Sequence, residues 1–465
     1  MTIEALRAAI RGTATAAGEA GYEEARGGLL FNGRAPARRP GIVVRAACVE
    51  DVQATVRYAA RHGLRVSPRG SGHNFSGIAL QEGIVLDLGA LDRIAIDPAA
   101  RIAEVEPAAR NGALAEALGA HGLAFPTGHC HSVSLSGYLL GGGFGWNSGA
   151  WGLACHNVEA VEVVMADGRL IRASETEHRD VFWAVRGGGP EFFGVVVRYR
   201  LRLHALPKAI RTSLYFYPIE RAAEVEAWVT AAMAVVPANV EFATHFQAAP
   251  PFVPGSGKVA MCTPTVFADS EAEARETLGR IAALAPAGAL AVEEGLPMSF
   301  AALYEAAATA FYTGTRYAVD TAWSVDPAGV FASLAASVAA APSPRAFALA
   351  VVLPPAAGKA GLPDAAFSMA GPAFGAAYAI WDAPEEDAEN VAWLRGASDA
   401  LAAGRLGHYV GEADLDRPGW LEACYAPEAL ARLRALAALH DPLGVFGRDD
   451  RPGARRRPEP ARLAG

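Results

Sequence analysis

A glycine-rich loop with a single histidine is the first stretch of the sequence that suggests chemistry. Residues 69 to 77 read Arg-Gly-Ser-Gly-His-Asn-Phe-Ser-Gly. Glycine at positions 70 and 72 allows positive φ angles, so that consecutive N–H groups can converge on an anion. A G-x-G-x-x-G dinucleotide fingerprint would need glycine in place of Phe75 and a helix afterwards, and it is therefore excluded. The spacing instead predicts a loop that holds a phosphate group, with His73 beside the ligand.

A second glycine-rich stretch spans Thr127 to Trp151 and contains His129, Cys130 and His131. Each glycine in a regular element costs roughly 0.5–1 kcal/mol of conformational entropy. Close approach of the backbone to a flat ligand would compensate for that cost. A tightly packed glycine helix, or a set of turns, is an equally good interpretation of the stretch by itself.

The bulk composition narrows the class of protein. The chain has 465 residues, of which 52% are hydrophobic and 19% charged, and this length is enough for two domains. Its net charge is −8, so it lacks the basic surface of a nucleic-acid-binding protein. We expect no secretory signal and no bilayer-spanning segment, because the start of the chain lacks an apolar core and no apolar run is long enough. Five cysteines without a C-x-x-C pair give no zinc or dithiol signature, and a reduced cytoplasmic compartment is expected.

The elements that must position these loops alternate between strands and helices in the first half of the chain. Apolar runs at 42–45, 64–67 and 84–88 predict strands, and the periodicity of 49–62 predicts a helix between the first two. The pattern continues with a strand pair around 97–98, a helix at 111–121, a hairpin of 158–166 with 170–173, a helix at 180–185, and a strand from 192 to 203. Asp167-Gly168 is a two-residue hairpin turn signal. Together these elements predict a mixed α+β domain.

From residue 207 the pattern changes to longer strands and amphipathic helices. Strands are predicted at 213–217, 241–247, 259–267, 346–353 and 376–381, and helices at 220–235, 269–284 and 385–402. This alternation predicts an antiparallel sheet backed by helices. We expect domains at 1–206 and 207–401, a C-terminal segment at 402–448, and a disordered tail at 449–465.

Five segments, taken in order, resemble the FAD-linked oxidases of the vanillyl-alcohol-oxidase type, in particular the berberine-bridge-enzyme-like oxidases. They are residues 69–73, 128–147, 158–168 and 182–189, and a C-terminal segment with Tyr409 and Asp441-Pro442-x-x-x-Phe446. The resemblance covers almost the whole chain. It implies an α+β fold with a two-subdomain PCMH-type FAD-binding domain at 1–206 (core about 36–206). It also implies a substrate domain at 207–401 and a segment, 402–448, that returns to the FAD domain.

The resemblance also implies roles for individual residues. His73 aligns with the histidine that bonds to the flavin 8α-methyl group, and Cys130 with the cysteine that bonds to C6. Val133 aligns with the position where a small side chain admits dioxygen, and Val195 with the one whose backbone meets the adenine. The implied cofactor-binding set is Arg69, Gly70, Ser71, Gly72, His73, Asn74, Gly128, Cys130, Val133, Gly137, Gly141, Gly142, Val195 and Tyr409. Without the resemblance, His73 would be interpreted as an ordinary loop histidine and Cys130 as a small buried hydrophobe.

The implied catalytic base is Tyr409. Its phenol, with an ordinary pKa near 10, would need activation, and the candidates are Glu412, Arg316, His131 and His129. We interpret Glu412 as a solvated loop charge more readily than as a base. His131 replaces a frequent proline and could contact substrate. The chain also departs from the family's pattern at three positions. Ser134 replaces a glycine, and Gly411 and Gly444 each replace an asparagine.

The predicted function is that of an FAD-dependent oxidase. It would transfer a hydride to flavin N5 from a C–H alpha to oxygen or nitrogen, in an alcohol, hemiacetal or amine of a small natural-product-like or sugar substrate. Dioxygen would then reoxidise the flavin and yield hydrogen peroxide. The alternatives are a dehydrogenase with another acceptor and a catalytically inactive flavin-binding protein. The expected partners are the small-molecule substrate and O2, with no metal, nucleic acid or membrane.

Overall fold

The computed structural model describes residues 3–255, 257–309, 314–354 and 362–447. The predicted disordered tail at 449–465 lies outside these residues. Three helices, α1 (Ile3–Arg7), α2 (Tyr22–Gly27) and α3 (Val49–His62), accompany the first sheet. Its strands are β1 (Thr13–Ala16), β2 (Ile42–Arg45), β3 (Val66–Arg69) and β4 (Ile84–Asp87), in the order β1-β2-β4-β3. Because β3 ends at Arg69, the glycine-rich loop leaves the edge of this sheet.

The second sheet is antiparallel and has the order β5-β6-β10-β8-β9. Its strands are β5 (Ile94–Asp97), β6 (Ile102–Val105), β8 (Val158–Met165), β9 (Leu170–Ser174) and β10 (Gly194–Arg202). Gly168 turns the β8–β9 hairpin with a φ of 80°. The helices of this part are α4 (Asn111–Gly119), α5 (Leu135–Leu140), α6 (Ser148–Trp151) and α7 (Arg179–Val185), and β7 (Leu123–Ala124) pairs with β11 (His204–Ala205).

An eight-stranded antiparallel sheet forms the other part of the molecule, in the order β15-β12-β14-β13-β17-β18-β16-β19. Its strands are β12 (Ala209–Pro218), β13 (Val240–Ala248), β14 (Lys258–Ala268), β15 (Ala291–Met298), β16 (Arg316–Ser324), β17 (Phe347–Val352), β18 (Ala373–Trp381) and β19 (Arg405–Gly407). The helices are α8 (Ala222–Val235), α9 (Glu271–Ala282), α10 (Phe300–Ala308), α11 (Pro327–Ala339) and α13 (Asp387–Ala400).

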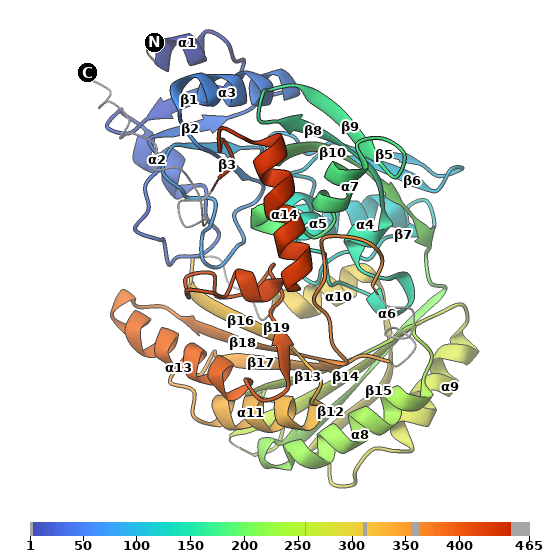
Figure 1. The fold of residues 1–465 in the computed structure, drawn as a ribbon. Helices are drawn as coiled ribbons and strands as arrows, with labels where there is room; N and C mark the ends of the chain where they lie inside the picture. Colours follow the sequence, from blue (N-terminus) through green and yellow to red (C-terminus); the bar gives the residue numbers. More distant parts are fainter. Residues whose placement is uncertain (1–2, 256, 310–313, 355–361, 448–465) are drawn as a thin grey trace.

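The two faces of this large sheet have different partners. Helices α8, α9, α11 and α13 cover the outer face (Figure 1), where one large apolar cluster includes Trp228, Phe331 and Leu394. The other face carries an aromatic layer with Trp323, Tyr378 and their neighbours, and it packs against residues of the first part such as Phe31, Phe75 and Phe144. The sheet therefore closes over the part that contains the glycine-rich loops.

After β19 the chain returns to the first part. Helix α14 (Pro427–His440) lies beside α7 (Figure 1), and its Leu433 is buried in the same apolar cluster as Val181 and Phe182. At the end of this segment the carboxylate of Asp441 accepts hydrogen bonds from the N–H groups of Val445 and Phe446 at 2.7 and 2.8 Å. The N–H of Val66 in β3 donates to the carbonyl of Val445 at 2.8 Å, which ties the segment to the strand before the first loop.

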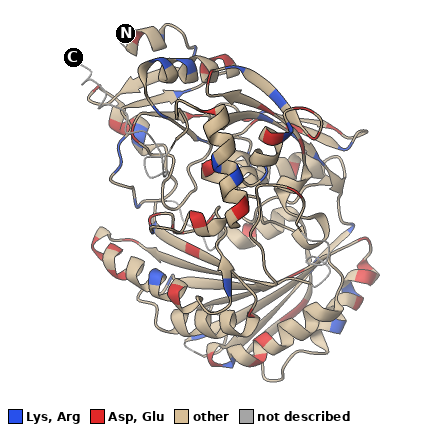
Figure 2. Cartoon of the chain, in the orientation of Figure 1, with Lys and Arg blue, Asp and Glu red and all other residues tan. Residues whose placement is uncertain are grey.

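Charged side chains of both signs are interspersed over both parts (Figure 2), and many form surface ion pairs. Among the described residues, every helix is too short or too polar to cross a lipid bilayer.

The predicted fold class is confirmed, including the antiparallel sheet backed by helices. The strand 42–45 and the helix 49–62 have the predicted bounds, whereas the strand expected at 64–67 runs from Val66 to Arg69. Of the two glycines that allow a positive φ in the first loop, only Gly72 adopts one, at 72°. Position 70 requires glycine for space, since a Cβ there would collide with the hydroxyls of Ser134 and Ser136.

Candidate active site

The two glycine-rich stretches meet at a chain of hydroxyl groups. Ser71 Oγ lies 2.9 Å from His73 Nδ1 and accepts a hydrogen bond from the Ser134 N–H at 2.9 Å. His73 Nε2 lies 2.8 Å from Ser132 Oγ, which is 3.5 Å from Cys130 Sγ. One serine hydroxyl therefore contacts both His73 and Cys130, although 57 positions separate the two residues in the sequence.

The imidazole of His73 is neutral near pH 7. Burial, followed by the positive charge of Arg110, lowers the pKa of His73 to about 4. The ring of Phe31 stacks on it, with centroids 4.5 Å apart and planes 16° apart. One ring nitrogen of a neutral imidazole keeps its lone pair, so His73 can act as a hydrogen-bond acceptor or a nucleophile.

The amide groups of the first loop make no hydrogen bonds to the described part of the chain. Within the described part of the chain, none of the five N–H groups from Gly70 to Asn74 donates a hydrogen bond to another protein group. The Arg69 guanidinium braces the loop from behind, donating to the carbonyls of Gly28, Leu29, Gly70 and Ser71 and to Asp87. Asn74 Oδ1 accepts from the Ser76 N–H at 3.1 Å and so holds the turn after the loop. A run of free amides on a braced loop is an anion-binding arrangement.

The second stretch places glycines where side chains would interfere. A Cβ on Gly128 would lie 3.0 Å from the Tyr138 ring, and one on Gly141 would lie 3.1 Å from the carbonyl oxygen of Gly137. Gly142 has a φ of 109°. Gly137 is exposed although Ser136 and Tyr138 on either side are buried, and a Cβ there would meet nothing within 4 Å. The N-terminal half of α5 therefore presents bare backbone to an open space.

Tyr409 reaches the second stretch from the C-terminal segment. Its hydroxyl accepts hydrogen bonds from the N–H groups of Gly143 and Phe144, at 3.2 and 3.3 Å. Burial, followed by the charge of Glu412, raises the pKa of Tyr409, while the two N–H donors lower it. The phenol is therefore protonated at neutral pH, with its oxygen held in place by the loop.

Glu412 is a partly buried member of this site, and its interpretation as a solvated loop charge is wrong. The hydroxyl of Tyr378 on β18 donates to Glu412 Oε2 at 2.9 Å. Burial raises the pKa of Glu412, with partial opposition from Tyr378 and the charge of His129. Periodicity gives no signal for this burial, because the residue lies in an irregular segment that a distant sheet covers.

His129 forms an ion pair with Glu241 on β13, with Nε2 2.7 Å from Oε1. Burial alone would lower the pKa of His129, but the carboxylate outweighs burial and holds it above its ordinary value. The side chain of His129 also lies edge-on to Trp146, with centroids 4.1 Å apart. Sequence reasoning did not single out Glu241, which has no local motif and reaches His129 only through tertiary packing.

Four further predicted residues make their contacts elsewhere than at the Tyr409 phenol. The imidazole of His131 is exposed, packs on Gly112 and lies edge-on to Tyr304 at 6.0 Å between centroids. Arg316 forms a bidentate ion pair with Asp387, at 2.6 Å for both bonds, and so is not available to activate Tyr409. Val133 is partly buried against α5, and Val195 is buried between the first two sheets.

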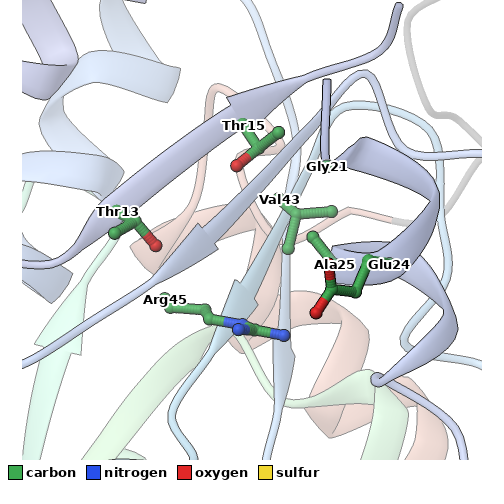
Figure 3. A pocket seen from close by; sticks show the side chains of 7 residues that line it. All are labelled: Thr13, Thr15, Gly21, Glu24, Ala25, Val43 and Arg45. Carbon is green, nitrogen blue, oxygen red and sulfur yellow. The ribbon is translucent and has the colours of Figure 1, made fainter. Parts of the chain in front are cut away.

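A separate cavity of about 160 Å³ lies at the first sheet, between β1, β2 and α2 (Figure 3). It is lined by Thr13, Thr15, Gly21, Glu24, Ala25, Val43 and Arg45. None of the candidate site residues lines it, and the glycine-rich loops do not reach it.

Comparison with known proteins, like the geometry of the two loops, indicates a protein that binds FAD. Residues 40–174 match the FAD binding domain family. The FAD-linked oxidoreductase nodO of Hypoxylon pulicicidum is 29% identical over 425 residues, which cover 90% of this chain and 93% of the relative. A xylooligosaccharide oxidase of Thermothelomyces thermophilus is 39% identical over 181 residues, 38% of this chain and 36% of the relative. The structure of BBE-like 1 from Physcomitrella patens has a TM-score of 0.82 at 21% identity and covers 96% and 98% of the two chains.

The chain therefore contains an FAD binding domain and has the fold of berberine-bridge-enzyme-like oxidases, and the relatives that it matches are named FAD-linked oxidoreductases and oxidases. FAD carries a dianionic pyrophosphate and a flat isoalloxazine ring, and an FAD binding domain must hold both. The unpaired amides of Gly70 to Asn74 fit the first group, and the bare backbone at Gly137 fits the second. The residues present therefore fit FAD.

Proposed function

We propose that this FAD-linked oxidoreductase is an oxidase that removes a hydride from a C–H alpha to oxygen or nitrogen and passes the electrons to dioxygen, with hydrogen peroxide as product. The observation that carries the proposal is the position of the Tyr409 phenol. Two backbone N–H groups of the second glycine-rich stretch hold its oxygen, and the partly buried carboxylate of Glu412 raises its pKa. FAD, when bound, would supply the redox chemistry, as cofactors do in such enzymes.

The chain's own residues would bind and orient the cofactor. The amides of Gly70, Ser71, Gly72, His73 and Asn74 would receive the pyrophosphate, with Arg69 bracing the loop. The remaining assignments follow the resemblance: Gly128, Val133, Gly137, Gly141, Gly142 and Tyr409 beside the flavin, and the Val195 backbone beside the adenine. We assign this work to residues 1–206, with residues 207–401 for the substrate and 402–448 for the return segment.

His73 and Cys130 would be the two covalent attachment points. The contacts with Ser132 support this pairing, because one hydroxyl orients both groups toward the same region. A neutral imidazole has the lone pair that such a bond requires, and the lowered pKa of His73 keeps it neutral.

Proton transfer from the substrate would be the task of Tyr409. The two N–H donors to its oxygen stabilise the phenolate, and burial opposes it, so the phenol needs help to act as a base. Glu412 provides a carboxylate with a raised pKa in the same site. His131 is the third proposed catalytic residue, as a substrate contact at the exposed edge of the second stretch.

Rapid-mixing spectroscopy tests the oxidase proposal. Alcohols, sugars and amines are mixed anaerobically with the holoenzyme to find one that bleaches the flavin, and the reduced enzyme is then mixed with air-saturated buffer. We expect rapid reoxidation with stoichiometric hydrogen peroxide. Slow reoxidation would favour a dehydrogenase with another acceptor, and no bleaching by any class would favour an inactive flavin-binding protein.

A Tyr409→Phe variant tests the role of the phenol in the same experiment. Loss of a general base typically costs 10²–10⁴-fold in rate, so the rate of flavin reduction should fall by about 10² or more while the flavin content stays the same. An unchanged reduction rate would remove Tyr409 from the proton transfer.

A further inference from the structure

The carboxylate of Glu412 has one oxygen that none of the described residues uses. Oε2 accepts the hydrogen bond from Tyr378, whereas Oε1 accepts none from the described residues. The backbone N–H of Glu412 donates to the Tyr409 carbonyl at 3.0 Å, which fixes the residue relative to the proposed base. A partly buried carboxylate with an open acceptor beside the reacting region is placed to meet a substrate group.

The charged groups around Glu412 supply no net positive charge to compensate its carboxylate. His129 is the one charged group besides Glu412 itself that acts on its pKa among the described residues, and His129 is already paired with Glu241 at 2.7 Å. His245 stands four residues after Glu241 on the same strand, so the two side chains share a face of the sheet. Burial and the charge of His129 lower the pKa of His245 to about 4, so it is neutral. The His129–Glu241 pair cancels and His245 adds nothing, so an ionised Glu412 keeps its negative charge.

The wall beside this carboxylate is aromatic. Tyr378 stacks on Phe347, with centroids 4.4 Å apart and planes 8° apart, and Phe75 meets Tyr378 edge to face at 6.3 Å. Aromatic faces attract cations, and they do so more strongly where water is excluded. Carboxylate and aromatic wall together favour an organic cation over a neutral polyol.

We propose that Glu412, held by Tyr378, recognises the protonated nitrogen of a cationic amine substrate, whose N–H donates to Glu412 Oε1. The proposal names the substrate class of the site described above and therefore rests on the proposed function. A neutral sugar would leave the carboxylate without a counter-charge, and desolvating an unpaired charge is costly. An ammonium group removes that cost, and charge-assisted hydrogen bonds are about twice as strong as neutral ones.

Calorimetric binding to the holoenzyme at pH 7 tests this recognition, with two of the three probes unable to turn over. The probes are 2-phenylpropan-2-amine, its neutral isostere 2-phenylpropan-2-ol, and xylobiose. Neither phenylpropane probe has a C–H alpha to its heteroatom, so neither can be oxidised by the proposed reaction. We expect the wild-type protein to bind the amine at least about tenfold more tightly than the alcohol. Tighter binding of the alcohol or of xylobiose would overturn the proposal, and this first measurement needs no variant.

Variants show which residue causes the preference for the amine over the alcohol. Glu412→Gln should reduce the preference for the amine to less than about threefold with little change for the alcohol, and Tyr378→Phe should reduce it partially. Glu389→Gln, the same charge change on an exposed position of α13, should leave the preference unchanged. Retained preference in Glu412→Gln would refute the role of this carboxylate. Binding is measured apart from oxidation, so the two proposals can fail separately. Selective binding of the amine without oxygen-dependent turnover would refute only the proposed oxidase activity. Turnover of neutral substrates without selective binding of the amine would refute only the proposed recognition of the amine by Glu412.

Discussion

Ser132 is the residue through which the two glycine-rich stretches become one site. Its hydroxyl is within 3.5 Å of both His73 and Cys130, and the His73 ring is fixed on its other side by Ser71. Orientation of this kind matters for bond formation, because reacting atoms must be held near 3–3.5 Å in a defined direction. The covalent attachments proposed for His73 and Cys130 thus belong to one contact network.

Intact mass spectrometry of the denatured protein checks these attachments. We expect one FAD to remain on the wild-type chain, one to remain in His73→Ala and in Cys130→Ala through the other residue, and none in the double variant. Cys262→Ala, a buried cysteine on β14 far from the loops in sequence, serves as the control and should keep its flavin. Release of FAD from the wild-type chain would contradict both attachments.

The element that carries Tyr409 and Glu412 is irregular, and a buried carboxylate anchors it. Asp320 on β16 accepts hydrogen bonds from Ser398 Oγ at 2.5 Å, Trp420 Nε1 at 2.8 Å and the Asp414 N–H at 3.1 Å. His408 Nδ1, next to Tyr409, is 3.3 Å from the same carboxylate. Burial alone would raise the pKa of Asp320, but these partners hold it below its ordinary value. One carboxylate therefore ties β16, α13 and the C-terminal segment together.

Removing that carboxylate should destabilise the protein more than removing any one of its partners. Removing the carboxylate leaves three buried or partly buried donors without an acceptor, at about 1–3 kcal/mol each, whereas losing one neutral hydrogen bond costs about 1 kcal/mol. We therefore expect Asp320→Ala to lower the urea midpoint strongly, Asp320→Asn to lower it less, and Ser398→Ala to lower it least. Equal midpoints for Asp320→Ala and Ser398→Ala would show that the carboxylate is not the anchor.

Some helices and strands were predictable from the sequence, whereas others were not. Helix α3 was predictable, because its apolar residues repeat on one face and Gly63 ends it with a φ of 65°. Strand β16 was missed: eight of its nine residues are buried, so no polar–apolar alternation marks it, and Asp320 interrupts the apolar run. Helix α11 was missed because its alanine-rich sequence gives little contrast between faces. The loops were predictable from glycine spacing, whereas Ser132, Glu241 and Tyr378 join the site only through contacts between distant segments.

At the scale of the whole molecule, the two parts meet through polar as well as apolar contacts. Asn32 Nδ2 donates to the Tyr317 carbonyl at 3.0 Å, and the Tyr317 N–H donates to Asn32 Oδ1 at 2.9 Å. Tyr304 donates to Thr127 Oγ1 at 2.8 Å, and His129 pairs with Glu241. Loss of packing in either part therefore removes partners from the other, and we expect the two parts to unfold together.

Neutral histidines in both parts make the molecule sensitive to acid. Burial is the main cause that lowers the pKa of His156 and His204 in the first part, and of His245 in the second, each to about 4. Between pH 6.5 and about 4 the unfolded chain therefore binds protons that the folded chain does not, so the free energy of unfolding falls as the pH is lowered through this range. Each histidine contributes a slope of at most about 1.4 kcal/mol per pH unit.

Urea midpoints at pH 7, 6 and 5 should decrease in that order. The decrease should be shallower in His245→Gln and the same as in the wild-type protein in His121→Gln, whose histidine is exposed. A midpoint that stays level or rises on acidification would mean that these rings take up protons without unfolding.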